Sequence, residues 1–301
     1  MAKSFARPVV ETLDNGDISF KRPSQAKEIF RRLRKNKGAM IGLFLLICII
    51  LVVIFADLIA PYEAGVVQVA ENKLAPMSAE HPLGCDNYGR DVLSRLVHGA
   101  RNSLLVAVAA SITSCLFGCT LGAIAGYFGG KVDMILMRLV DIIYSVPTLL
   151  YVILIMLIFG SNIFSMLLAI GISSWVGMAR LVRGQILTLK EQEYALAAYV
   201  IGASKKRIMF KHLIVNCMGS IIVNTTLMVP NAIFTEAFLA FVGIGISIPQ
   251  ASWGTMANDA RSLIQSQPIQ IIWPVLAICL TMLSLNFIGD GLSEALDPKK
   301  K

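Results

Sequence analysis

The chain has 301 residues, of which 56% are hydrophobic and only 15% are charged, and its formal net charge is +8. Soluble domains typically carry about 25% charged residues, so this composition excludes ordinary soluble domains. The apolar residues form blocks of about 18 or more, which is the length needed to cross a bilayer about 30 Å thick. We therefore expect an integral membrane protein.

Most basic residues lie between the apolar blocks. The positive-inside rule places such clusters on the cytoplasmic side of a membrane, where anionic headgroups attract them. We therefore assign the positive charge to topology and to contact with the lipid bilayer, and we expect no nucleic-acid partner. The six cysteines form no C-x-x-C pair and have no metal-ligand spacing, so no metal site is expected.

The first third of the chain divides into three segments. Residues 1–38 are polar and basic, and we expect them to be cytoplasmic, with a short helix at the membrane surface. Residues 39–60 form the first span, which has no cleavage site after it and is interpreted as a retained anchor. Residues 61–101 form a polar loop outside the cell. An apolar helical face within this loop predicts a helix lying on the outer membrane surface, formed by Val92, Leu93, Leu96 and Val97.

Residues 102–290 are predicted to hold five further spans. The second span is rich in Ala, Gly and Ser, which permits close helix packing. The third span, residues 134–159, has Pro147 near its middle, where a kink is expected. Early in this span Arg138 and Asp141 are expected to pair, because residues three apart are neighbours on a helix.

A basic cytoplasmic loop, residues 184–211, separates the fourth and fifth spans, and residues 291–301 form a cytoplasmic tail. The predicted fold is an all-α membrane bundle of about six spans with both termini in the cytoplasm.

The cytoplasmic loop contains the run EYALAAYVIGAS, which begins at Glu193. It predicts a short Ala-rich helix that ends at Gly202, since glycine accepts the left-handed conformation of a helix end. Ser204 then has the residue type that caps a second helix. Two short helices joined by small residues predict a compact knob that enters a groove on a partner. Its candidate contact residues are Glu193, Tyr194, Ala197, Ala198, Gly202, Ala203 and Ser204.

A second run, HPLGCDNYGRDVLSR, begins at His81 in the external loop. Gly84 and Gly89 permit tight turns, and Asp91 and Arg95 are spaced as a helical ion pair. Two interpretations remain open: the run is structural, or it receives a binding protein or a partner subunit. The residues singled out are Asp86, Gly89, Arg90, Asp91 and Arg95.

The loop after the fourth span resembles the E-A-A-x-x-x-G loop of importer ABC permeases. Ala197, Ala198 and Gly202 match this pattern, whereas Leu196 replaces its Glu and Val215 replaces a later Pro. The external run resembles the G-T-D-x-x-G-R-D-V-x-S-R segment of the oligopeptide/dipeptide/nickel subgroup, with Cys85 in place of Thr. Runs at 234–245, 252–254 and 286–298 are similar to closing motifs of the second permease subunit of that subgroup.

This resemblance implies a type I importer bundle in the inner membrane of a prokaryotic cell. It implies that the knob is a coupling helix for separate ATPase subunits, that those subunits carry ATP and Mg, and that this chain binds no cofactor. The implied partners are a sister permease that completes a heterodimer, two P-loop ATPases and an extracytoplasmic peptide-binding protein. The implied function is ATP-driven import of oligopeptides or dipeptides.

A peptide path needs hydrogen-bonding groups with little net charge. Candidates in the third and fifth spans are Tyr144, Pro147, Asn224, Asn231, Thr235 and Glu236. Each of these polar side chains could instead bond a neighbouring helix. Glu236 is expected at the outer end of its span, either capping the path or facing external water.

Other functions have weaker support. Import of nickel or another small solute by the same subgroup remains open, because the external binding protein makes most of the selection. An ion-driven secondary transporter would require an inverted repeat and acidic residues at mid-membrane, and we find neither. A membrane enzyme lacks support because no P-loop, H-E-x-x-H or G-x-S-x-G motif occurs, so no catalytic site is expected.

Overall fold

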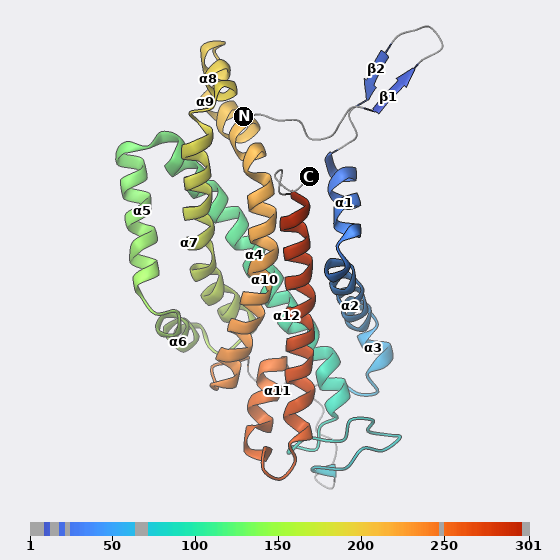
Figure 1. The fold of residues 1–301 in the computed structure, drawn as a ribbon. Helices are drawn as coiled ribbons and strands as arrows, with labels where there is room; N and C mark the ends of the chain where they lie inside the picture. The colour runs from blue at the N-terminus through green and yellow to red at the C-terminus, as the bar shows by residue number, and fades with distance from the viewer. Residues whose placement is uncertain (1–8, 13–17, 22–24, 64–71, 247–249, 297–301) are drawn as a thin grey trace.

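In the computed structural model, the described residues are 9–12, 18–21, 25–63, 72–246 and 250–296. They form a helical bundle with one small hairpin (Figure 1). The hairpin pairs β1 (Val9–Thr12) with β2 (Ile18–Lys21) in antiparallel register, with Val9 opposite Lys21. This hairpin lies in the segment before the first span, where no strand was expected. The bundle itself confirms the predicted all-α fold.

The helices have the following bounds. The first group is α1 (Gln25–Lys35), α2 (Lys37–Ile54), α3 (Ala56–Ile59), α4 (Val92–Phe128), α5 (Gly130–Ser145), α6 (Thr148–Phe159) and α7 (Ile163–Leu189). The second group is α8 (Glu193–Val200), α9 (Lys205–Arg207), the π-helix η2 (Ile208–Leu213), α10 (Ile214–Phe241), α11 (Trp253–Ala260), the 3-10 turn η3 (Arg261–Leu263) and α12 (Ile269–Leu296).

The two ends of the bundle carry different elements (Figure 1). Helices α8 and α9 lie at one end, together with α1 and the C-terminal end of α12. Helix α11 and the loop that precedes α4 lie at the opposite end. The elements that were predicted to be cytoplasmic therefore share one end, and those predicted to be external share the other.

Five helical stretches are long and apolar enough to cross a membrane, and a sixth span arises if α5 and α6 are taken as one broken span. These two helices meet at an angle of 85°. The break follows from Pro147, because proline disfavours helical geometry in the residue before it, and Val146 is extended at φ −87° and ψ 124°. The predicted kink in the third span is thus a complete break of the helix.

Helix α4 corrects the expected surface helix. Val92 and Val97 were placed on a helix that lies on the membrane surface and leads into the second span, but they belong to the same uninterrupted helix as that span. At about 1.5 Å per residue, this helix is longer than a bilayer core is thick. Its first turns therefore extend the spanning helix outward, and both valines are buried against other parts of the protein.

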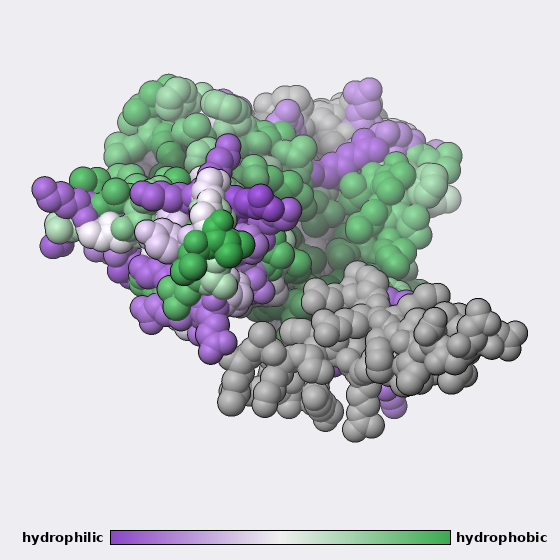
Figure 2. Space-filling model, turned by 90° about the horizontal axis from the view of Figure 1, so that it is seen from above, coloured by the Kyte–Doolittle hydropathy of each residue, from purple (hydrophilic) through white to green (hydrophobic). Residues whose placement is uncertain are grey.

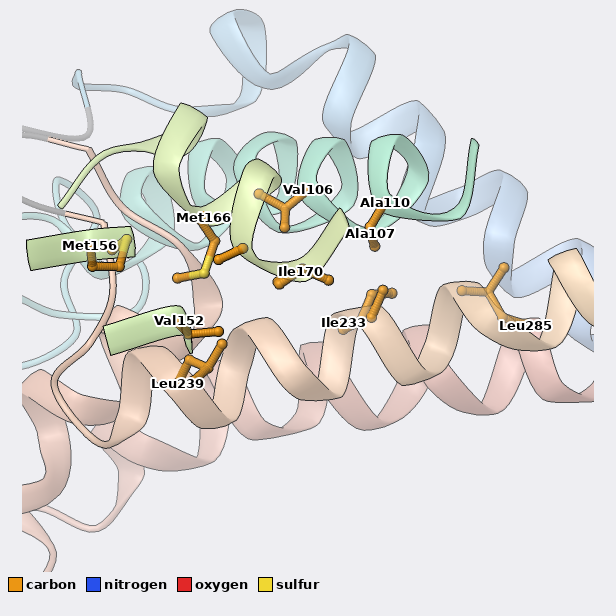
Figure 3. Packing of buried hydrophobic residues seen from close by; sticks show 12 residues of the cluster. Val106, Ala107, Ala110, Val152, Met156, Met166, Ile170, Ile233, Leu239 and Leu285 are labelled. Atoms are coloured by element: carbon orange, nitrogen blue, oxygen red, sulfur yellow. The ribbon is translucent and has the colours of Figure 1, made fainter. Parts of the chain in front are cut away.

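Close packing of α4 on α7 confirms the expected role of small residues in the second span. An added Cβ at Gly118 would lie 2.6 Å from the Met178 side chain, and one at Gly122 would collide with the Ala179 carbonyl. The core next to this contact gathers side chains from several helices (Figure 3). Its buried members include Val106 and Ala110 of α4, Met166 and Ile170 of α7, Ile233 and Leu239 of α10, and Val152 and Met156 of α6.

Ion pairs join α5 to α7 in a way that the sequence did not predict. Asp141 accepts a 2.8 Å hydrogen bond from Arg180, not from Arg138 as expected. About two turns nearer the start of α5, Asp133 accepts bonds of 2.5 and 2.6 Å from Arg183. Sequence spacing indicated Arg138, which is a neighbour of Asp141 on the same helix. The observed partner, Arg180, lies on α7, which packs against α5.

Candidate coupling knob, translocation face and external ion cluster

The segment 193–207 forms the predicted knob, and its turn has the geometry of a Schellman helix end. Gly202 has a φ of +80°. The N–H of Gly202 donates to the Tyr199 carbonyl and the N–H of Ala203 donates to the Ala198 carbonyl, both at 3.0 Å. Ser204 then caps α9 by accepting a 3.3 Å bond from the Arg207 N–H. Both predicted roles, a helix end at Gly202 and a cap at Ser204, are confirmed.

The base of the knob is anchored in the bundle. Ala195 and Ala198 face inward and are buried, and Tyr194 is half-buried beside them. Ala198 was expected to contact the partner, and this expectation is corrected because its side chain packs into the core instead. Burial raises the pKa of the Tyr194 phenol. These residues pack against a cluster drawn from α7, η2 and α10, which includes Met178, Val182, Ile186, Ile208, Met209 and Leu213. A push on the knob would therefore reach the core of α7 and α10 directly.

The tip of the knob is apolar and exposed. Val200 and Ile201 are 81% and 83% exposed, and Leu196 and Tyr199 are more than half exposed. Viewed from above, this apolar tip stands among hydrophilic side chains (Figure 2). The predicted contact residues Glu193 and Ala197 are also exposed. Tyr199, Val200 and Ile201 were not among the predicted contact residues, although an apolar run next to a predicted helix end in a polar loop indicates such a contact.

A polar stripe follows the open side of α10. Asn224, Asn231 and Thr235 were candidate path residues. Asn216 and Ser220 continue this row of polar residues for two further helical turns. None of the five is buried. Amide groups in a span are costly to expose to hydrocarbon, so this side is expected to face water or another protein. The stripe is therefore a candidate translocation face.

The stripe runs into a groove of about 900 Å³ between α1, α10 and α12, at the end of the bundle that carries the knob. Asn216, Ser220 and Asn224 line it from α10, and Ser293 lines it from α12. Glu28, Ile29 and Arg32 of α1 form a further wall. We refer to this space as the exit groove.

Tyr144 and Pro147 do not lie on the polar stripe of α10. Both are exposed, but they lie on α5 and at the α5–α6 break, and α5 packs on α4 and α7. The Tyr144 ring lies 4.3 Å from the guanidinium carbon of Arg180 on α7. The predicted path residues thus fall into two groups on different helices.

Glu236 does not face external water, and it is not on the stripe. Its side chain is fully buried, and Oε2 accepts a 3.0 Å hydrogen bond from Ser103 of α4. Ser103 in turn accepts a 3.2 Å bond from the Trp253 N–H at the start of α11. The path interpretation of Glu236 is therefore corrected, because its carboxyl lies in the junction of α4, α10 and α11.

The external run folds around an ion cluster that consists of Asp86, Arg90, Arg95 and Asp259, of which the first three are buried and Asp259 is partly exposed. Asp86 accepts hydrogen bonds from both arginines, and each arginine donates a 2.8 Å bond to Asp259. Gly89 makes the intervening turn at φ +74°. Asp259 comes from α11 and was not predicted from the sequence. It lies far from Arg90 and Arg95 along the chain, so no local sequence pattern indicated that they would meet.

Asp91 has a separate role at the start of α4. Its carboxylate caps this helix by accepting a 2.7 Å bond from the Ser94 N–H, and it lies 2.9 Å from His81 Nδ1. Asp91 was expected to pair with Arg95, which belongs to the ion cluster instead. Because Asp86, Arg90, Asp91 and Arg95 are all buried, they hold the loop in shape and present no exposed side chain for direct docking.

Comparison with known proteins identifies two matching families. Residues 118–301 match the family described as "binding-protein-dependent transport system inner membrane component". Residues 24–76 match the "N-terminal TM domain of oligopeptide transport permease C".

Individual relatives match over most of the chain. The oligopeptide transport system permease protein OppC of Bacillus subtilis is 45% identical over 95% of this chain and 93% of its own length. The dipeptide transport system permease protein DppC of the same organism is also 45% identical, over 93% of this chain and 88% of its own. OppC of Escherichia coli K12 is 39% identical over 97% of both chains.

Proposed function

Because the chain belongs to the family of inner membrane components of binding-protein-dependent transport systems, we propose that it is a permease subunit of an ATP-driven peptide importer. It is a multi-pass protein of the inner membrane. Relatives named as oligopeptide and dipeptide permeases match over nearly the whole chain, which supports a peptide as the solute. The chain itself is a non-catalytic membrane subunit.

The observation that carries this proposal is the knob. It places an exposed apolar tip, which includes Val200 and Ile201, beyond the end of the bundle. An exposed apolar patch rimmed by polar residues is typical of a protein contact. The knob base packs on α7 and α10, so a partner that moves the tip also moves the helix that carries the polar stripe.

The partner at the tip is a P-loop ATPase, and two such subunits complete the transporter. They bind ATP and Mg, whose hydrolysis supplies the difference in free energy between outward-open and inward-open states that alternating access requires. A sister permease forms a heterodimer with this chain and supplies the other half of the path. The polar stripe of α10, with Asn224, Asn231 and Thr235, faces that path.

An extracytoplasmic peptide-binding protein delivers the peptide at the opposite end. There the ion cluster fixes the external loop on α11, so this surface is presented in one shape. The buried side chains, which include Arg90 and Arg95, serve the docking indirectly, and exposed neighbours such as Tyr88 make the contacts.

The proposal is tested in proteoliposomes that contain the chain with the subunits that purify with it. Labelled di-, tri- and tetrapeptides are supplied outside the vesicles together with the binding protein. ATP is enclosed inside, on the side where the ATPase subunits lie. We expect peptide to accumulate only with ATP. Accumulation of Ni²⁺ without peptide would move the assignment to the alternative solute, and failure to transport either solute would refute the proposed function.

A further inference from the structure

One wall of the exit groove is formed by α1, which precedes the first span. Glu28 and Arg32 occupy successive turns of this helix and line the groove, and Glu28 is only 9% exposed. Charged side chains that are withdrawn from water are expected to be paired or to serve a ligand. The other walls offer neutral hydrogen-bonding groups from Asn216, Asn224 and Ser293.

Arg32 has unused hydrogen-bonding capacity. Its Nη2 donates a 2.7 Å bond to Glu28 Oε1, whereas its buried Nη1 has no partner among the described residues. A buried donor without a partner is unfavourable. The planar guanidinium is suited to binding a carboxylate through two parallel hydrogen bonds. Because Nη1 is buried and Nη2 is bonded to Glu28, such binding requires the guanidinium to leave Glu28 and turn into the groove.

We propose that the exit groove holds the transported peptide as it leaves, and that Arg32 binds the C-terminal carboxylate of that peptide. This inference rests on the proposed function. The polar stripe of α10 leads into the groove, and amide side chains such as Asn216 and Asn224 can bond a peptide backbone of any sequence. The volume of about 900 Å³ lies within the range of about 300–1,000 Å³ that is typical of ligand sites.

Glu28 gives the site a means of release. It competes with the peptide carboxylate for the same guanidinium, because both are acceptors for Arg32. When the Glu28–Arg32 pair closes again, the peptide is displaced toward the cytoplasm. Binding is thereby kept weak enough for transport to continue.

The test is photo-crosslinking in the assembled transporter. A benzoylphenylalanine is placed at Ser293, in the groove, and in a second preparation at Thr120, an exposed position on α4 away from the groove. A tritiated tetra-alanine peptide is added from the ATPase side. We expect the peptide to label the chain from position 293 and not from position 120, and a C-terminally amidated peptide to give at least about tenfold less label.

Three variants separate ligand binding from helix stability. R32Q should lower the label from position 293 at least about tenfold. E28Q breaks the same ion pair but keeps the guanidinium, so the label should persist or increase. R34Q changes an exposed arginine on the same helix and should have no effect. Equal loss of label in R32Q and E28Q would show that the ion pair only supports α1, and would overturn the inference.

Two further outcomes also overturn it. The first is a crosslink from position 293 only to lipid or to the sister permease. The second is equal labelling by the free and amidated peptides. Either result, obtained in proteoliposomes that still import peptide with ATP, would refute the exit site and leave the proposed function standing. Failure of the unmodified complex to import peptide would instead refute the proposed function.

Discussion

The backbone N–H of Ala203 donates a 3.0 Å hydrogen bond to the Ala198 carbonyl. This bond closes the turn between α8 and α9, and Gly202 lies within the turn at φ +80°. An added Cβ at Gly202 would meet no atom within 4 Å. The requirement for glycine is therefore conformational, and the space around it is open for a partner.

Substitution of Gly202 should reduce coupling in a defined order. A left-handed conformation costs most residues about 1–2 kcal/mol, and Asn tolerates it best. We expect G202N to import peptide at close to the normal rate, G202A to be slower, and G202W to be inactive because its side chain also fills the docking face. ATP-dependent uptake measures the order, with membrane insertion as a control. Normal uptake by G202W would contradict the assignment of the knob.

The α4–α7 contact should tolerate no side chain at Gly122. An alanine there would place its Cβ against the Ala179 carbonyl, and overpacking of this kind costs typically about 1–3 kcal/mol. We expect G122A to lower the thermal midpoint in detergent. Gly177, on α7, has no atom within 4 Å of an added Cβ, so G177A should be neutral or slightly stabilising. Equal midpoints for the two variants would show that the helices do not pack as described.

The broad plan of the fold was readable from the sequence because apolar blocks and basic clusters are local signals. The knob was readable for the same reason, since Gly202 and Ser204 act within a few residues of their positions. Contacts between distant segments were not readable. The pairing of Asp141 with Arg180, and the burial of Glu236 against Ser103, depend on which helices become neighbours.

Pro147 illustrates a third case. The sequence located the disturbance in the third span but not its size. A proline in a span is compatible with anything from a slight bend to a full break, depending on how neighbouring helices satisfy the freed backbone groups. Here the helices on either side of it lie at 85°.

The external ion cluster should matter for stability. Asp86 bonds both Arg90 and Arg95, and all three side chains are nearly inaccessible to solvent. Removing one member of a buried pair typically costs about 3–5 kcal/mol, because the remaining charge stays buried. We expect D86N to lower the thermal midpoint in detergent by at least about 6 °C. E80Q changes an exposed carboxylate of the same loop and should leave the midpoint unchanged; a similar loss in both would contradict the role of the cluster.

The Cys85 thiol should be unreactive in the folded protein. Burial, with the nearby Asp91 and Asp86 charges, raises its pKa to about 11. At pH 8 only about one thiol in a thousand would be ionised, compared with about one in ten at the ordinary pKa of 9.0, and the thiolate is the reactive form. Maleimide labelling followed by peptide mapping should find Cys85 unmodified until the protein is denatured. Rapid labelling of the folded protein at pH 8 would contradict its burial.

The same pKa shift makes alkaline pH unfavourable. The pKa of Cys85 is higher in the folded chain than its ordinary value of 9.0. The stabilisation that comes from the protonated thiol is therefore complete below about pH 9 and is lost as the pH rises toward 11. C85S should flatten the decline of the thermal midpoint between these values. An unchanged decline would show that other groups cause it.

The most direct test of the account is co-purification of the tagged chain from its native membrane in a gentle detergent, with partners identified by mass spectrometry. We predict a P-loop ATPase, a second permease and a peptide-binding protein. In I201D, which places a charge at the exposed apolar tip of the knob, the ATPase should be lost and the second permease retained. Recovery of the unmodified chain alone, or equal recovery of the ATPase with I201D, would contradict the claim that this knob couples an ATPase to a peptide permease.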